Sequence, residues 1–147
     1  LLAGAVTGAR HYWPFLAASP RDEWTALRVH EAGRTIAASV GKGRVLTLGP
    51  IFPLEGGATI YPALVTGAFE WRTARIASPE EHSRRRLLGP SDLAALDADP
   101  TLAAVLAGVE RDPAENLEAP IAAYVARRGW VPTRILDELT LWHPPGD

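Results

Sequence analysis

Short apolar runs alternate with amphipathic segments along this chain, and the order of the two predicts an α/β fold. Residues 44–48 form a compact apolar run after a glycine-rich turn, which is typical of a buried parallel strand. Residues 103–109 form a second run of the same kind. Residues 130–136 and 139–143 flank a short acidic turn and predict two further strands paired as a hairpin.

Helix start and stop signals predict helices before the first strand and between the first two strands. Ser19 and Pro20 predict the cap and first residue of a helix that runs to about Val40. Apolar positions at helical spacing predict another helix over residues 67–77. Ser78, with a glutamate three residues later, is a capping box that predicts a third helix, ending near residue 88.

Two more helices are predicted nearer the C-terminus. Ser91 is expected to cap a short helix over residues 92–97. The last helix is expected to start after Asn116, because Pro120 is tolerated only in the first turn, and to end at Gly129. Residues 60–65 remain open between strand and loop, since a proline interrupts them.

The alternation of strands and helices predicts one α/β domain over residues 19–147. Helical crossovers between parallel strands are right-handed and place helices on both faces of a sheet. We expect a small three-layer domain with a mainly parallel sheet of about four strands and an antiparallel C-terminal hairpin at one edge. Residues 1–18 form a separate apolar and aromatic arm. This arm is interpreted either as a segment docked on the domain or as the end of a membrane helix reaching the interface.

Composition narrows the class of protein. The chain has 147 residues, 47% of them hydrophobic, which suits one globular domain. A net charge of −2 excludes a domain-wide basic field, so nucleic acid is not an expected partner. The absence of cysteine excludes disulfides and thiolate metal sites. Because the chain also lacks methionine, Leu1 is expected not to be the native start, and the chain to be processed or a piece of a longer protein.

The loop after the first strand holds the best candidate site, since open α/β sheets bind ligands beyond the carboxyl ends of their strands. Glu55, Gly56 and Gly57 lie there, a grouping suited to sugar hydroxyls, with Tyr61 as a stacking surface. The alternative is a glycine-rich turn that only redirects the chain. Glu110, at the end of the second strand, faces the same edge if the strands are parallel. Glu55 and Glu110 are then either a carboxylate pair for acid–base work or two solvated acids.

Other chemistry has little support in the sequence. The four histidines lack the spacing of a zinc site, and no serine stands in a G-x-S-x-G elbow. Without a nucleotide-binding fingerprint, we assign no cofactor, metal or catalytic residue. Residues 84–86 are three consecutive arginines. They are interpreted as a solvated helix face paired to Glu80 and Glu81, or alternatively as a contact for anionic lipid head groups or a phosphate.

Several motifs resemble, in order, the C-terminal soluble region of bacterial membrane proteins similar to glycosyltransferase family 39, the dolichyl-phosphate-mannose protein mannosyltransferase-like group. The resemblance covers roughly residues 20–145 and is carried by residues 43–57, 60–62, 66–72, 104–110, 118–120 and 139–142. It implies a multi-helix membrane enzyme that uses a polyprenyl-phosphate sugar donor, with this domain on the periplasmic side. Such enzymes keep their catalytic aspartate between early membrane helices, which this chain lacks, so no catalytic residue is carried over.

Three hypotheses follow. The leading one is a non-catalytic extracytoplasmic domain that packs on the membrane body of the same parent chain. It would help to position a glycan acceptor or a polyprenyl-phosphate sugar, and the aromatic end of the arm favours this view. The second is a stand-alone small α/β enzyme whose Glu55 and Glu110 lie about 5–10 Å apart. The third is a protein-interaction module with an apolar patch around residues 1–15.

Overall fold

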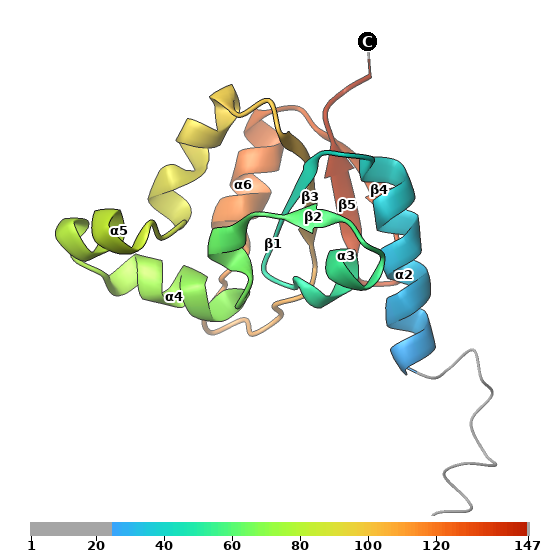
Figure 1. Cartoon of the computed structure of the whole chain (residues 1–147), viewed down its shortest axis with the longest axis horizontal. Helices are drawn as coiled ribbons and strands as arrows, with labels where there is room; N and C mark the ends of the chain where they lie inside the picture. Colours follow the sequence, from blue (N-terminus) through green and yellow to red (C-terminus); the bar gives the residue numbers. More distant parts are fainter. Residues whose placement is uncertain (1–24, 147) are drawn as a thin grey trace, which may run out of the picture.

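A five-stranded sheet with the order β2-β1-β3-β5-β4 forms the centre of the domain (Figure 1). The computed structural model describes residues 25–146. β1 pairs in parallel with β2 and β3, whereas β5 pairs antiparallel with β3 and β4. The strand bounds are β1 Arg44–Thr47, β2 Thr59–Ile60, β3 Leu102–Ala107, β4 Val131–Arg134 and β5 Thr140–His143. The chain therefore has the predicted mixed α/β fold, with the antiparallel hairpin at one edge.

One detail of the sheet differs from the prediction. Part of the segment that the sequence left open forms β2, so the sheet has five strands rather than about four. The structure also gives the strand order, which the sequence did not predict: the last strand, β5, lies inside the sheet and leaves β4 at the edge. All four β4 residues are exposed, and Pro132 among them has no N–H to offer a further strand.

Within residues 25–146, seven helical segments surround the sheet. Their bounds are α2 Thr25–Val40, α3 Ile51–Glu55, η2 Pro62–Leu64, α4 Ala68–Ile76, α5 Pro79–Arg85, η3 Pro90–Ala98 and α6 Ala119–Arg127. The predicted cap at Ser19 and the arm over residues 1–18 lie outside the described residues. The predicted end of the first helix at Val40 is confirmed. Within residues 25–146, no helix combines the length and apolarity needed to cross a bilayer.

The helix signals were correct at some termini and wrong at others. Ser78 and Glu81 form the predicted capping box at the start of α5. The prediction that Ser91 caps the next helix is wrong, because that segment is a 3₁₀ helix that begins at Pro90. Its first turn is held by the Asp92 carboxylate, which accepts the backbone N–H of Gly89 at 2.7 Å. Residues 51–55 form α3 rather than a loop, since a proline in the first turn of a helix loses no hydrogen bond.

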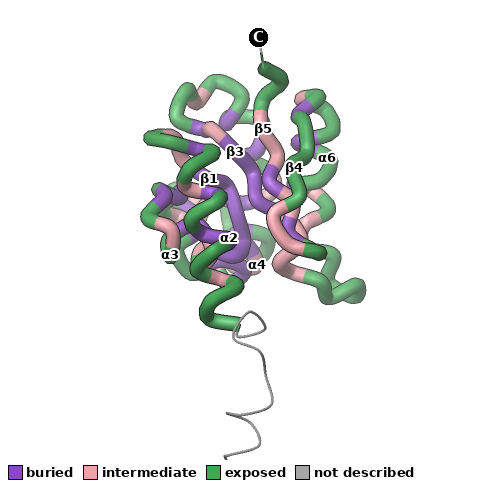
Figure 2. The backbone as a smooth tube through the Cα atoms, turned by 90° about the vertical axis from the view of Figure 1, so that its right-hand side faces the viewer, coloured by how far each residue is buried: buried purple, intermediate pink, exposed green. Residues whose placement is uncertain are grey.

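The helices cover both faces of the sheet, as expected. Successive residues of a strand point to opposite faces, so Val45 and Leu46 of β1 enter different cores. Val45 packs with Ile36 of α2 on one face, and α3 lies beside α2. Leu46 packs on the other face with Trp71 of α4 and Ile121 of α6. Figure 2 shows the buried strands enclosed between exposed outer layers.

Candidate functional site

The Glu55 carboxylate lies at the end of α3 and reaches α2. Its Oε1 is 3.0 Å from Nδ1 of His30, and about half of each side chain is exposed. An exposed pair of this kind contributes little to stability, about 0–1 kcal/mol. Glu55 also lines a shallow hollow with Pro50, Ile51, Leu54 and Val65. The carboxylate is thus accessible, and its surroundings in that hollow are mainly apolar.

The two glycines after Glu55 have structural roles. Gly56 meets Gly33 of α2 backbone to backbone, and a Cβ atom on Gly56 would lie only 1.9 Å from the Gly33 carbonyl oxygen. Gly57 adopts a φ of 82°, which L-residues rarely adopt, and turns the chain toward β2. These positions fit the alternative of a turn that redirects the chain and allows α2 and α3 to touch.

Tyr61 is a core residue, and the expectation that it offers a stacking surface is wrong. Only 7% of the residue is exposed. Its hydroxyl donates to Oδ2 of Asp99 at 2.8 Å, and the Arg44 guanidinium lies 5.7 Å from the ring centroid. Burial raises the pKa of Tyr61 well above its usual range, and the hydrogen bond to Asp99 adds to the shift. The hydroxyl end of the ring is thus held by Asp99, which lies just before β3.

Glu110 lies after β3 and interacts with α4. One of its oxygens is 3.6 Å from Nη2 of Arg72, which lies 2.6 Å from Glu115. Glu55 pairs with α2, and Glu110 with α4, and these two helices cover opposite faces of the sheet. Glu110 does not line the hollow beside Glu55. The structure therefore gives the two carboxylates separate partners, on helices that cover opposite faces of the sheet. None of the hollows described within residues 25–146 is lined by both.

A carboxylate that the sequence analysis missed holds the end of β3. Glu118 accepts the backbone N–H groups of Gly108, Val109 and Glu110 at 2.6, 3.1 and 3.2 Å. Three successive N–H groups form a small anion-binding concavity, which this side chain fills. Gly108 has a φ of 99° and comes close to the Glu138 carbonyl, so a side chain has no room there. A glycine directly after an apolar strand is the one sequence signal of this arrangement.

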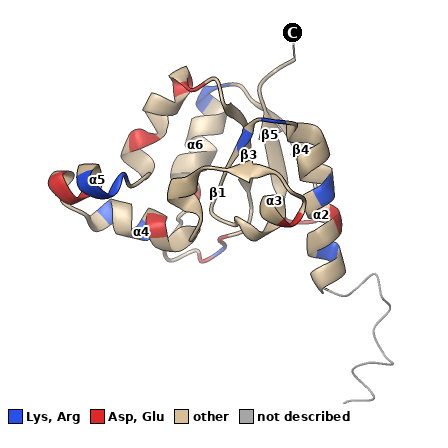
Figure 3. Ribbon diagram, viewed as in Figure 1, with Lys and Arg blue, Asp and Glu red and all other residues tan. Residues whose placement is uncertain are grey.

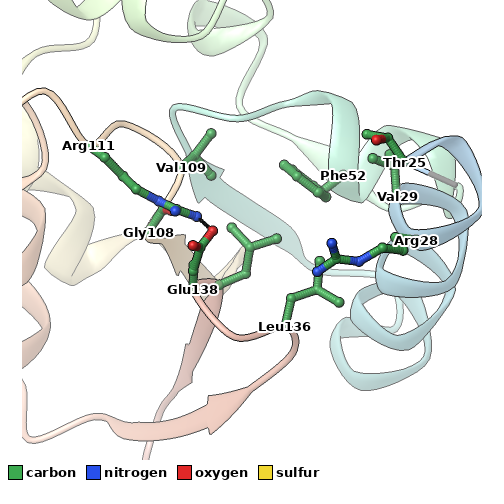
Figure 4. Close-up of a pocket in the computed structure, with 10 residues that line it drawn as sticks. Thr25, Arg28, Val29, Phe52, Gly108, Val109, Arg111, Leu136 and Glu138 are labelled. Atoms are coloured by element: carbon green, nitrogen blue, oxygen red, sulfur yellow. Dashed lines mark hydrogen bonds and ion pairs between the residues drawn. The ribbon is translucent and has the colours of Figure 1, made fainter. Parts of the chain in front are cut away.

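The cavity beside this turn opens at the carboxyl ends of β1 and β3 (Figure 4). Its volume is about 220 Å³. Figure 4 shows Arg28 reaching over the cavity from α2, while Arg111 and Glu138 point toward each other on the far side. The apolar lining consists of Val29, Phe52, Val109, Leu136 and Leu139. None of these positions was predicted, because they come from four segments whose juxtaposition depends on the strand order.

The cavity has the chemistry of a binding feature rather than of a reaction centre. Glu138 is the sole carboxylate among its described lining residues, and it forms an ion pair with Arg111. Thr25 supplies the one hydroxyl among them. A small apolar group next to the Arg28 guanidinium would fit this lining. Among residues 25–146, no three histidine, aspartate or glutamate side chains gather in a way that would hold a metal ion.

An apolar surface lies next to this edge of the sheet. Ile51, Leu54 and Val65 are 60%, 46% and 59% exposed, and all three line the hollow beside Glu55. We call these three residues the apolar surface. The sequence places all three in or near a segment expected to be a loop, where scattered apolar residues carry no signal. Their grouping becomes visible only when α3 and the end of η2 are in place.

Comparison of the chain with protein-family models, with curated proteins and with solved structures found no match. The resemblance to the glycosyltransferase family 39-like group therefore rests on the sequence motifs alone.

Proposed function

We propose that residues 25–146 form a non-catalytic domain of a membrane glycosyltransferase-like protein, placed on the periplasmic side. In this role the domain docks on the membrane body of the same parent chain. The observation that carries the proposal is the apolar surface, Ile51, Leu54 and Val65, which is exposed beside the carboxyl ends of the parallel strands. The family resemblance supports the nature of the parent protein, and the surface supports the docking.

The path of the chain supports the membrane body of the same chain as the partner of this surface. Thr25, the first described residue, lines the same cavity as Gly108, directly after β3. Preceding residues are thus joined to the domain at the carboxyl edge of the sheet. Ile51 follows β1 at that edge, so the apolar surface lies on the side to which any preceding part of the protein is tethered. Tethering makes the second contact effectively intramolecular, which strengthens even a small interface.

The size of the surface suits an intramolecular contact. Full burial of a valine, leucine or isoleucine side chain contributes about 1.5–3 kcal/mol. Each of the three residues is already about half buried, so a partner would gain part of that amount at each position. A non-catalytic role agrees with the carboxylates, since Glu55 and Glu110 are held by partners on opposite faces of the sheet.

Photo-crosslinking in the intact parent protein tests the docking. The 147 residues contain no cysteine, so Val65→Cys and Val131→Cys each place a single thiol in this chain. The two valines are similarly exposed, 59% and 51%, but Val131 lies in the edge strand β4. A benzophenone label at position 65 should crosslink to the membrane segments of the same chain, and a label at position 131 should not. Equal crosslinking from both positions would overturn the docking.

The same pair of variants separates the remaining hypotheses. If position 65 crosslinks to a different protein, the domain is an interaction module instead. A membrane-impermeant maleimide should label Val131→Cys in intact spheroplasts if the domain is periplasmic. Labelling that requires lysis of the spheroplasts would place the domain on the cytoplasmic side and contradict this part of the proposal.

A further inference from the structure

We propose that helices α4 and α5 bind the surface of a bilayer that contains anionic phospholipid. The inference deepens the proposed function, because a domain tethered beside a membrane would meet such a surface. Its structural basis is independent of the apolar surface, since it uses other residues on other helices. The partner is a lipid surface rather than the protein part of the membrane body.

Two apolar side chains on α4 are exposed far more than is usual. Phe69 is 74% exposed and Ile76 is 87% exposed, the highest values among the exposed large apolar residues of the described chain. They are seven residues apart in one helix, so they lie on the same face two turns apart. Side chains of this size on one helix face are the ones that enter the headgroup–acyl boundary when a helix lies on a bilayer.

Arginines lie beside Ile76, the second of these apolar side chains. Arg75, Arg84, Arg85 and Arg86 are exposed, and within residues 25–146 none of the four forms an ion pair. Ile76 and Arg85 line one hollow of about 200 Å³ between α4 and α5. The Arg75 side chain lines the neighbouring hollow, again with Ile76. Ile76 lies between two guanidinium groups, with Glu81 also lining the first hollow and Glu115 the second. Guanidinium groups beside an apolar side chain suit a lipid headgroup layer, which is apolar below and anionic at the phosphates.

The expected pairing of the arginine run with Glu80 and Glu81 is wrong. Glu81 is engaged at the start of α5, where its carboxylate accepts the Ser78 backbone N–H as part of the capping box. The α5 arginines thus form no ion pair with Glu80 or Glu81, although Glu81 and Arg85 line the same hollow. Figure 3 shows acidic residues at one end of α5 and basic residues at the other.

Acidic residues on these helices reduce the local positive charge without removing it. Residues 68–86 hold five arginines against three glutamates, in a chain whose net charge is −2. Glu80 is exposed, Glu70 and Glu81 are partly exposed, and Glu81 lines one hollow with Arg85. Arg72 is already paired with Glu115.

Vesicle co-sedimentation of the 147-residue chain tests the proposal directly. The probes are vesicles of phosphatidylcholine alone and of phosphatidylcholine mixed with phosphatidylglycerol, both at low ionic strength. Each arginine near an anionic surface contributes about fivefold to partitioning. Arg84→Gln/Arg85→Gln/Arg86→Gln should therefore lower partitioning onto the mixed vesicles by up to about a hundredfold. The matched control, Arg34→Gln/Lys42→Gln/Arg134→Gln, removes the same charge elsewhere and should have little effect.

A second pair of variants tests the apolar part. Phe69→Ser/Ile76→Ser should lose most binding to the mixed vesicles, whereas Leu27→Ser/Val131→Ser, two other exposed apolar positions, should retain it. Circular dichroism should show all variants folded, since every changed side chain is at the surface. Binding that ignores phosphatidylglycerol, equal losses in variants and controls, or displacement by inorganic phosphate at constant ionic strength would overturn the proposal. Vesicle binding is measured apart from the parent protein, so its failure is distinct from failure of the Val65 crosslink.

Discussion

The two ends of the parallel strands differ in whether nearby side chains have partners. We call the end where β1 and β3 begin the amino edge, and the end where they finish the carboxyl edge. At the amino edge, Asp97 accepts hydrogen bonds from Arg127 and Arg128 at 2.8 and 2.9 Å. Asp99 accepts the hydroxyl groups of Thr101 and Tyr61 there. Beside the carboxyl edge, Ile51 and Val65 stand exposed. The polar groups of the amino edge are paired within the domain, whereas the carboxyl edge leaves apolar side chains exposed to solvent.

This contrast indicates which edge of the sheet still has exposed side chains that a partner could cover. The hydrogen bonds from Arg127 and Arg128 lower the pKa of Asp97, and those from Thr101 and Tyr61 lower the pKa of Asp99. Charges that stabilise one another need no further partner. Val131 is the exception on the amino side, since it is half exposed in β4. This exception makes it a useful control for residues on the other edge.

The largest loss of stability is expected at the contact between α3 and α2. Gly56→Ala places a Cβ atom 1.9 Å from the Gly33 carbonyl oxygen, which forces the helices apart. We expect the free energy of unfolding to fall by about 3 kcal/mol or more, as judged by urea denaturation. Gly57→Ala is the control, because its Cβ meets open space and costs only about 1–2 kcal/mol for the left-handed backbone. Equal costs at the two positions would contradict the close contact.

Removing the carboxylate of Glu118 should weaken the turn after β3. Hydrogen bonds to a charged group contribute about 1.5–3 kcal/mol, and Glu118→Gln keeps only one neutral acceptor, so we expect a loss of about 2 kcal/mol. Hydrogen exchange at Gly108 and Glu110 should accelerate in this variant. Glu115→Gln changes an exposed acid in the same loop and should cost less than about 1 kcal/mol. Unchanged exchange at both amides would contradict the role assigned to Glu118.

Tyr61→Phe tests the amino edge. The variant loses the hydrogen bond to Asp99, so the free energy of unfolding should fall by about 1 kcal/mol at neutral pH. Because the pKa of Tyr61 is raised on folding, its contribution is complete below the ordinary value of 10.0 and is lost as the pH rises above it. The difference between the two proteins in urea denaturation should therefore shrink above pH 10. A constant difference up to high pH would show that the hydroxyl is not buried as described.

The smallest effect on stability is expected at the exposed valines. Val65→Ser and Val131→Ser should each change the free energy of unfolding by no more than about 0.5 kcal/mol, because both side chains face solvent. Only Val65→Ser should weaken contact with the parent protein, as measured by protease protection of the domain in membranes. Loss of protection in both variants would remove the distinction between the edges.

Local patterns predicted the elements of this fold better than its site. Apolar runs gave β1 and β3, and Ser78 with Glu81 gave the start of α5, since these signals act within a few residues. Glu55 and Glu110 were linked by the rule that parallel strands share an edge, but the rule says nothing about faces. The helices that hold them cover opposite faces, and the sequence does not specify this arrangement. Tyr61 was misjudged because its burial depends on Asp99, 38 residues away.

The position of β5 between β3 and β4 has a consequence for synthesis of the chain from its N-terminus. β4 is made before β5, yet it pairs only with β5, so it has no strand to bind when it first emerges. β3 likewise lacks its antiparallel neighbour until β5 has been synthesised. The nascent chain therefore remains without half of its strand pairings until residues 140–143 are available. Because these late pairings join residues distant in the sequence, such as Val105 and Trp142, completing the sheet last is expected to slow folding.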